Sequence, residues 1–572
     1  MLTRLVVRNF KQLMEIDIPL SQPVVFIGPN NSGKTTALQA LALWDLGVKA
    51  WSSKRSADAK PEKRPGITIN RKDLVTVPVP SAKLLWKDAH VRDSVKEDGK
   101  ARTLNVRMEV IVEGGTRSAW TCGVEFDYSN EESLICRPIR KPGFGDSRVA
   151  GAEFTEIPDE ARQVKLAYLP PMSGLADREF MKQQGEIAFL IGQGQTAGIL
   201  RNLCYQVALD QPEAWESVSR ELSSLFGVKL RQPEFIPERS EIRLTYDQGK
   251  TELDISSAGR GFQQTLLLLT HLAANPGAIL LLDEPDAHLE VLRQRQVFNL
   301  ISDAAAASGA QIIAASHSEV VLNEAAQRGT VVAFVGSKPH PINNKSSQVV
   351  KSLTEIGWDL YYQAESQGWI LFLEGSTDLA ILQAFAKTLE HPASEKLQRP
   401  FVHYVSTDHP SPAQRLFHGL REACPHLVGF ALFDRIDSPL NSEGALVERC
   451  WSQREIENYL CEREVILEWA SLPRTLFSNS DRELMNRKIQ EMENALNTLG
   501  KPSPWLADLK VTDDFLDPLF KKYFQEKGLP LTMRKSDYHE LAALVPRDRI
   551  PAEVIEVLDA IVETANRATL PP

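Results

Sequence analysis

The sequence lacks any long hydrophobic run. No stretch approaches the roughly 18 consecutive apolar residues that a membrane-spanning helix needs. The opening residues, MLTRLVVRNF, also lack the apolar segment and the small-residue cleavage site of a secretory signal peptide. The six cysteines form no Cys-x-x-Cys pair and no spacing that is typical of metal ligands. We therefore expect reduced thiols, a cytoplasmic protein and no membrane partner.

An excess of positive charge is absent as well. The formal net charge of the 572 residues is −10, which argues against a protein that coats nucleic acid through summed positive charge. Residues 51–100 are a local exception, with twelve Lys and Arg against seven Asp and Glu. Part of this stretch, SSKRSADAKPEKRPG, is predicted to be a loop that is either solvated or in contact with DNA. The length indicates two to four domains at about 150 residues each.

A phosphate-binding loop follows an apolar strand near the start of the chain. PVVFIGPNNSGKTTALQALAL fits the pattern G-x-x-x-x-G-K-S/T, with a strand before it and a helix after it. In such a loop, backbone N–H groups surround phosphates at a helix N-terminus, while Lys34 reaches the outer phosphates and Thr35 binds Mg²⁺. The sequence thus predicts an ATP site formed by Gly28, Asn30, Asn31, Ser32, Gly33, Lys34, Thr35 and Thr36.

Two further buried strands supply the groups that such a loop needs. AILLLDEP ends on Asp283 and Glu284, and AQIIAASHS runs into His317. We expect Asp283 to hold the Mg²⁺ and Glu284 to polarise the attacking water as the catalytic base. His317 is placed to sense the γ-phosphate, although a lone histidine is more often structural.

A run of small residues precedes a helix upstream of Asp283 and predicts a second anion site. It reads ISSAGRGFQQTLLLL and contains Ser257, Gly259, Gly261 and Gln264. The order of loop, small-residue signature, acidic strand and SHS resembles the ABC-type ATPases of the RecF and SMC group, as does the opening LTRLVVRNFKQLMEIDIPL. In that family the signature of one subunit closes over ATP bound to another, which implies a homodimer or homotetramer. The signature differs from LSGGQ in having Arg260 between its glycines.

The first domain is expected to span residues 1–350. The roughly 200 residues between loop and signature are too many for a simple connection. They show no sustained heptad pattern, so the sequence favours a compact helical arm for dimerisation at about residues 155–235 over the long coiled coil of an SMC protein.

A second α/β domain is expected at residues 365–572. GWILFLEGSTDLAILQAFAKTL, RPFVHYVSTD and LVGFALFDRID alternate with helical patterns, which indicates a parallel sheet. Carboxylates follow these strands and suit Mg²⁺ or Mn²⁺. They are Glu374, Asp434 and Asp437, with Glu455 and Glu457 shortly after. Taken alone, Glu374 and Asp378 could instead only stabilise the N-terminus of a helix, through capping and the helix dipole.

This order of acids resembles the topoisomerase–primase (Toprim) fold. An ABC-type ATPase followed by a Toprim domain is similar to the OLD family of nucleases, which includes the ATPase-nuclease subunit of Gabija anti-phage systems. The resemblance implies Glu374, Asp378, Asp434, Asp437 and Glu457 as metal ligands, with Mg²⁺, Mn²⁺ or Ca²⁺ bound. It also implies that Lys535 of LTMRKSDYHELAAL neutralises charge on the cleaved phosphate. The family's usual acid pair is Asp-x-Asp, whereas Asp434 and Asp437 are three residues apart.

The main functional hypothesis is an ATP-regulated, metal-dependent DNA endonuclease, or nickase, of the OLD type that acts in anti-phage defence. Its catalytic residues would be Glu284, Glu374, Asp434 and Lys535, and its partner DNA. The resemblance leaves open a partner defence protein and a structured or reverse-transcribed nucleic acid. A non-cleaving, ATP-dependent sensor or scaffold is the alternative, supported by the altered acid spacing. A RecF-like recombination mediator is disfavoured by the second acidic domain. The sequence shows no recognisable Ser/His/Asp or Cys/His arrangement of the kind used in nucleophilic catalysis.

Overall fold

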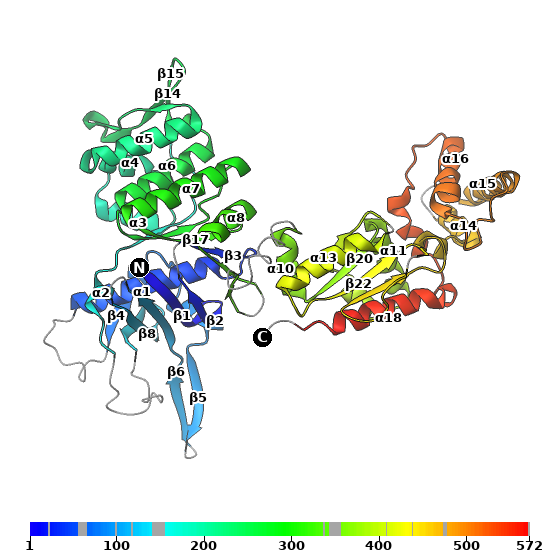
Figure 1. Cartoon of the computed structure of the whole chain (residues 1–572), viewed down its shortest axis with the longest axis horizontal. Helices are drawn as coiled ribbons and strands as arrows, with labels where there is room; N and C mark the ends of the chain where they lie inside the picture. Colours follow the sequence, from blue (N-terminus) through cyan, green and yellow to red (C-terminus); the bar gives the residue numbers. More distant parts are fainter. Residues whose placement is uncertain are drawn as a thin grey trace. The chain divides into compact units, whose positions relative to one another are not determined.

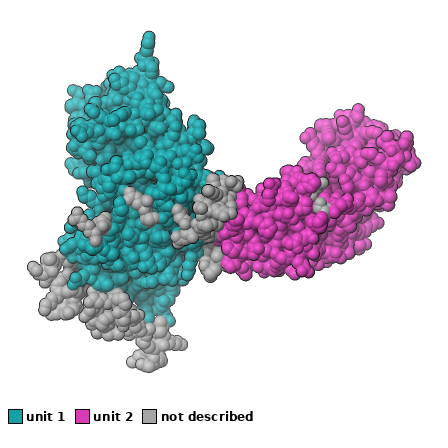
Figure 2. Space-filling view, in the orientation of Figure 1, with its two compact units in different colours: residues 1–350 teal, residues 351–572 magenta. Residues whose placement is uncertain are grey.

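The computed structural model divides into two compact units, residues 1–350 and 351–572 (Figure 2). It describes residues 1–20, 23–54, 66–97, 100–115, 118–139, 155–335, 338–342, 356–407, 409–437, 439–472 and 478–569. Both units combine helices with sheets, so the predicted α/β class is confirmed. Most of the charged stretch predicted as a loop lies outside the described residues. Within them, no helix has both the length and the apolar content to cross a membrane.

The first unit begins with an antiparallel sheet of order β2-β1-β7-β8-β9-β4. Its strands are β1 (Leu2–Phe10), β2 (Leu13–Pro19), β4 (Ile67–Asn70), β7 (Met108–Gly114), β8 (Trp120–Asn130) and β9 (Ser133–Pro138). In β7, fully buried residues alternate with partly exposed ones, the pattern of a sheet with one face on the core. A separate ribbon of β5 (Arg92–Glu97) and β6 (Lys100–Asn105) extends away from this sheet (Figure 1).

A mostly parallel sheet of order β10-β16-β17-β3-β18-β19 carries the nucleotide-binding motifs. Its strands are β3 (Val24–Ile27), β10 (Leu166–Leu169), β16 (Ile279–Asp283), β17 (Gln311–Ser316), β18 (Thr330–Ala333) and β19 (His340–Pro341). Every residue of β3, β16 and β17 is buried, as expected for central parallel strands. Strand β17 pairs with both β16 and β3, so the residues that follow these strands share one edge.

Helix α1 (Lys34–Lys54) packs against strands of both sheets and joins them into one core. The other α-helices among the described residues of the unit are α2 (Asp159–Arg162), α3 (Gln184–Gly192), α4 (Leu200–Asp210), α5 (Pro212–Phe226), α6 (Arg260–Ala274), α7 (Val291–Ser308) and α8 (Glu319–Arg328). Small strands complete it: β11 (Lys229–Leu230), β12 (Glu234–Ile236), β13 (Glu241–Arg243), β14 (Thr245–Gln248) and β15 (Thr251–Asp254). Helices α4 and α5 pack on α6, so the inserted stretch supports the signature helix (Figure 1).

The second unit is built on a parallel sheet of order β21-β20-β22-β23. Its strands are β20 (Trp369–Leu373), β21 (Val402–Tyr404), β22 (Val428–Phe433) and β23 (Leu446–Cys450). The α-helices in its described part are α10 (Trp358–Gln367), α11 (Ser376–Thr388), α12 (Ala393–Lys396), α13 (Pro410–Ala423), α14 (Arg463–Ser471), α15 (Ser478–Thr498), α16 (Asp517–Lys527), α17 (His539–Ala542) and α18 (Ala552–Asn566). Strand β23 was not predicted. One hydrophobic core joins the sheet, α11 and the C-terminal helices.

Candidate functional site

The loop after β3 is shaped to receive phosphates. Gly28 and Gly33 have φ angles of +149° and +105°, which residues with a Cβ rarely adopt. A Cβ on Gly28 would lie 2.5 Å from the carbonyl oxygen of Phe334, so only glycine fits there. The Nζ of Lys34 donates hydrogen bonds to the carbonyl oxygens of Gly28 at 2.7 Å and Pro29 at 2.8 Å. The ammonium therefore already lies inside the loop, at the N-terminus of α1.

Asp283 is held by two hydroxyl groups at the end of β16. Thr35 Oγ1 donates to Oδ1 of Asp283 at 3.0 Å, and Tyr168 OH donates to Oδ2 at 3.3 Å. Burial, together with the charge of Glu284, raises the pKa of Asp283 to about 6 against the favourable hydrogen bond from Thr35. A carboxylate destabilised in this way gains from a nearby cation. Thr35 and Asp283 thus fit a Mg²⁺ ion, and Tyr168 on β10 is a contributor that the sequence analysis missed.

Glu284 faces the phosphate-binding loop across a cavity of about 250 Å³. The cavity is lined by Gln12, Asn30, Asn31, Ser32, Gly33, Lys34, Thr35, Thr36 and Glu284. Glu284 has a φ of +49°, a value that residues other than glycine rarely adopt and that is common at functional sites. His317 Nδ1 lies 3.7 Å from Oε1 of Glu284, and the imidazole is 54% exposed. The predicted base and the predicted sensor are therefore neighbours beside the predicted loop.

The signature residues lie on another part of the unit's surface. The cavity lining given above includes none of Ser257, Gly259 and Gly261. Ser257 and Gly259 are exposed, and Gly259 immediately precedes α6. Helix α6 rests on the turn after β16, where Gln264 Nε2 donates to the carbonyl oxygen of Pro285 at 3.4 Å. Exposed small residues at a helix N-terminus, away from their own ATP site, suit contact with nucleotide on a second subunit.

In the second unit, two carboxylates meet at the start of α11. Glu374 directly follows β20, and Asp378 accepts a hydrogen bond from the backbone N–H of Gly375 at 2.9 Å. Asp378 thus stabilises the helix start, as the simpler interpretation required. Burial and the negative charge of Glu374 nevertheless raise the pKa of Asp378, with Lys535 acting in the opposite direction. The two functions of Asp378, helix capping and participation in a charged cluster, coexist.

Asp434, Glu455 and Glu457 extend this cluster from β22 and the segment after β23. Burial raises the pKa of Asp434 to about 8, with further contributions from the charges of the neighbouring carboxylates. Those neighbours are Glu374, Glu457, Asp378 and Glu455. Burial and Glu455 raise the pKa of Glu457 to about 7, although Lys535 Nζ lies 3.2 Å from its Oε1. The fold therefore gathers five acids and one lysine from distant parts of the sequence. We define these six residues as the acidic cluster.

The cluster suits a hard divalent cation by its chemistry. All its potential ligands are carboxylate oxygens, and buried, mutually repelling carboxylates are stabilised by a cation. Glu455 Oε1 accepts the backbone N–H of Thr512 at 2.6 Å, while its Oε2 is buried with no hydrogen-bond partner in the described part of the chain. The described residues do not present three histidine, cysteine or carboxylate groups as a ready ligand set. Glu374, Asp378, Asp434, Glu455 and Glu457 are thus candidate ligands rather than an assembled shell.

Asp437 stands apart from this arrangement. Its side chain is exposed, and its charge is not among those that act most strongly on Asp434. Glu455 and Glu457, by contrast, lie close enough to Asp434 for their charges to raise its pKa. The structure therefore brings together all the predicted acids of this unit except Asp437.

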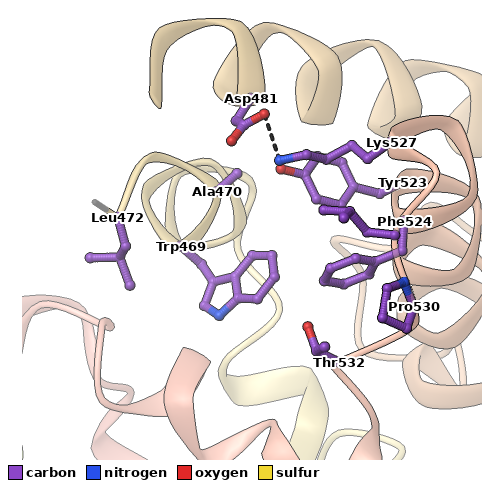
Figure 3. Close-up of a pocket in the computed structure, with 10 residues that line it drawn as sticks. Trp469, Ala470, Leu472, Asp481, Tyr523, Phe524, Lys527, Pro530 and Thr532 are labelled. Carbon is purple, nitrogen blue, oxygen red and sulfur yellow. Dashed lines mark ion pairs between the residues drawn. The ribbon is translucent and has the colours of Figure 1, made fainter. Parts of the chain in front are cut away.

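A separate aromatic pocket of about 240 Å³ lies among the C-terminal helices (Figure 3). Trp469, Tyr523 and Phe524 form its wall, and Lys527 Nζ pairs with Asp481 Oδ1 at 2.7 Å at its edge. The other lining residues are Ala470, Leu472, Leu529, Pro530 and Thr532. None of the residues that line this pocket belongs to the acidic cluster.

Two family models match the first unit. The model described as an AAA ATPase domain matches residues 1–62, and the model described as an AAA domain, putative AbiEii toxin, Type IV TA system matches residues 199–323. Together these ranges contain the phosphate-binding loop, the signature, Asp283, Glu284 and His317.

The expected resemblance to the OLD family is confirmed by a relative. The chain is 26% identical over 334 residues to the OLD nuclease of Thermus scotoductus (strain ATCC 700910 / SA-01), which covers 56% of this chain. The chain spans 59% of the length of that relative.

Solved structures of SMC heads are also similar. One is the head bound to the C-winged helix domain of ScpA, at 15% identity and a TM-score of 0.33, covering 59% of this chain and 97% of that one. Another, from Thermotoga maritima, is 17% identical with a TM-score of 0.30 and covers 60% and 98% of the two chains.

Proposed function

We propose that this relative of the OLD nucleases is an ATP-regulated, divalent-metal-dependent DNA endonuclease. The acidic cluster is the observation that carries the proposal. Carboxylates that are buried together and repel one another destabilise a fold, and such groups commonly hold the cations used in phosphodiester hydrolysis. Glu374 and Asp434 directly follow the parallel strands β20 and β22, at the end where α/β sheets place their reactive groups.

In the first unit, the chain's residues would bind and orient ATP. Backbone N–H groups of the loop and the ammonium of Lys34 would hold the phosphates, while Thr35 and Asp283 would hold a Mg²⁺ ion. Glu284 would orient the attacking water by accepting its hydrogen bond, and His317 would lie beside the outer phosphate. Tyr168 keeps the carboxylate of Asp283 in one orientation. A homodimer or homotetramer would let the exposed signature contact ATP on another subunit.

In the second unit, Glu374, Asp434 and Glu457 would hold Mg²⁺ or Mn²⁺, and Asp378 and Glu455 would fix their surroundings. A bound divalent ion supplies a Lewis acid that activates water and neutralises developing charge. Lys535 would hold a phosphate oxygen by charge-assisted hydrogen bonding, and its ion pair with Glu457 keeps the ammonium at the cluster. A role in anti-phage defence and a cytoplasmic location are supported by family resemblance and by the free cysteines.

A non-cleaving sensor or scaffold is the second candidate. It is favoured by the exposure of Asp437 and by the lack of a ready ligand set among the described residues. Incubation of the purified protein with supercoiled plasmid and Mg²⁺ or Mn²⁺, with and without ATP, separates the two. Nicking that depends on the metal supports the nuclease. Intact plasmid in every condition, with ATP hydrolysis retained, supports the sensor.

A further inference from the structure

Arg435, which directly follows Asp434, lies at the rim of the acidic cluster. Its Nη1 donates to Oδ1 of Asp508 at 2.8 Å and to the carbonyl oxygen of Ser452 at 3.4 Å. Its backbone N–H also donates to the carbonyl oxygen of Arg454 at 3.2 Å. The guanidinium is therefore fixed between the end of β22 and the segment that leads into Glu455 and Glu457, while 32% of the side chain remains exposed.

The segment that carries Asp508 is docked on the same cluster. The backbone N–H of Arg454 donates to the carbonyl oxygen of Ala507 at 2.9 Å, and Asn458 Nδ2 donates to that of Leu509 at 3.0 Å. The backbone N–H of Thr512 then binds Glu455 Oε1 at 2.6 Å. Asp508 is thus presented by an ordered backbone, although its own side chain is 67% exposed.

The charge balance at this rim requires cations if a polyanion is to approach. Five carboxylates of the cluster repel phosphate groups, and Lys535, which pairs with Glu457, is the one cation within the cluster itself. Lys510 lies close enough to Glu455 for their charges to interact, but it pairs with Asp513 at 3.0 Å. Arg435 has a planar fork of donors that matches phosphate, and both of its side-chain hydrogen bonds in the described structure leave from Nη1. Its partner, Asp508, is a carboxylate that a phosphate could replace.

We propose that Arg435 binds a backbone phosphate of duplex DNA beside the cleaved bond, and that Asp508 occupies this guanidinium until DNA replaces it. The inference rests on the proposed function, because it names a substrate contact of the same site. An exposed ion pair of this kind is weak, so displacement of Asp508 costs the DNA little. A phosphate that receives two parallel hydrogen bonds would exceed what Asp508 offers.

The test is duplex DNA binding by fluorescence anisotropy over a range of salt concentrations, in the presence of Mg²⁺ and in a Glu374→Ala background that prevents cleavage. Arg435→Gln should weaken binding about tenfold and reduce the slope of log K against log salt by about one. Asp508→Asn should strengthen binding about two- to fivefold. In the Arg435→Gln background, Asp508→Asn should have no effect, because the two side chains act through one contact.

Asp513→Asn is the matched control, since it removes a carboxylate of the same segment that pairs with Lys510. If Asp508→Asn and Asp513→Asn strengthened DNA binding equally, and did so also in the Arg435→Gln background, the cause would be the change in net charge rather than the contact with Arg435. That result would overturn the inference. So would an unchanged salt slope in Arg435→Gln, or no duplex binding by the parent. Arg435→Lys keeps the charge but loses the planar fork of donors, so its DNA affinity should lie between those of the parent and Arg435→Gln. This variant replaces Arg435→Gln in the test if the latter does not fold. Failure of the wild type to cleave DNA would overturn the proposed function, but the binding measurements could still be interpreted, because they do not depend on cleavage.

Discussion

Replacement of Tyr168 by Phe tests how the first unit holds its Mg²⁺. The hydroxyl is buried, and its single described role is the 3.3 Å hydrogen bond to Oδ2 of Asp283. Hydrogen bonds to charged groups contribute about 1.5–3 kcal/mol, and this one is longer than the usual O–H···O distance, so we take about 1–1.5 kcal/mol. Loss of the donor leaves one carboxylate oxygen buried and free to rotate away from the cation.

The expected result for Tyr168→Phe is a rise of about five- to tenfold in the Mg²⁺ concentration that half-saturates ATP hydrolysis, with ATP affinity nearly unchanged. The steady-state rate of ATP hydrolysis, measured at saturating ATP over a range of Mg²⁺ concentrations, gives this half-saturating concentration directly. A thermal melt checks that the variant is folded. Leu166→Ala on the same strand is the control for disturbed packing of β10. An unchanged Mg²⁺ dependence in Tyr168→Phe, or the same rise in Leu166→Ala, would refute the reasoning.

Four further variants test separate parts of the account. Glu284→Gln should bind ATP but hydrolyse it at least a hundredfold more slowly, whereas Lys34→Ala should lose hydrolysis through lost phosphate contacts; parental turnover by Glu284→Gln would exclude it as the base. Burial lowers the pKa of His271 to about 4. As the pH falls below about 6.5, this histidine therefore takes up a proton in the unfolded state before it does so in the folded state. The free energy of unfolding of the first unit should consequently fall by about 2 kcal/mol between pH 7 and pH 5. In a thermal melt, the unfolding transition of the first unit is identified as the one whose midpoint ATP raises. Between pH 7 and pH 5 this midpoint should fall less in His271→Leu than in the parent, and an equal fall in both proteins would contradict the prediction. Asp437→Ala should retain most metal-dependent cleavage, because that side chain is exposed; full inactivation would place it in the cluster.

Local motifs made the nucleotide site predictable from the sequence. A phosphate-binding loop works through glycine conformation and adjacent residues, so its chemistry is readable in eight consecutive positions. Asp283 and Glu284 were recognisable because an apolar run ends on them. Tyr168 was not, since only the pairing of β10 with β16 brings its hydroxyl to Asp283.

The acidic cluster was only partly predictable. Glu374 and Asp434 follow strands whose apolar runs are clear, and parallel pairing of β20 with β22 brings their ends together. Sequence spacing could not decide between Asp437 and the glutamates, because the backbone after β22 turns Asp437 outward while the segment after β23 returns Glu457 to the cluster. The bond between Glu455 and Thr512 and the ion pair between Arg435 and Asp508 join residues 57 and 73 positions apart and leave no local signal.

The most direct measurement of the central claim is plasmid cleavage by matched variants of the second unit. Wild type should nick supercoiled DNA with Mg²⁺ or Mn²⁺, and Glu374→Ala and Asp434→Ala should each reduce cleavage at least a hundredfold while ATP hydrolysis is retained. Glu443→Ala, an exposed acid of the same unit, should cleave like the parent. Cleavage by Glu374→Ala and Asp434→Ala at the parental rate would contradict the account, because the acidic cluster would then not be the site of DNA hydrolysis.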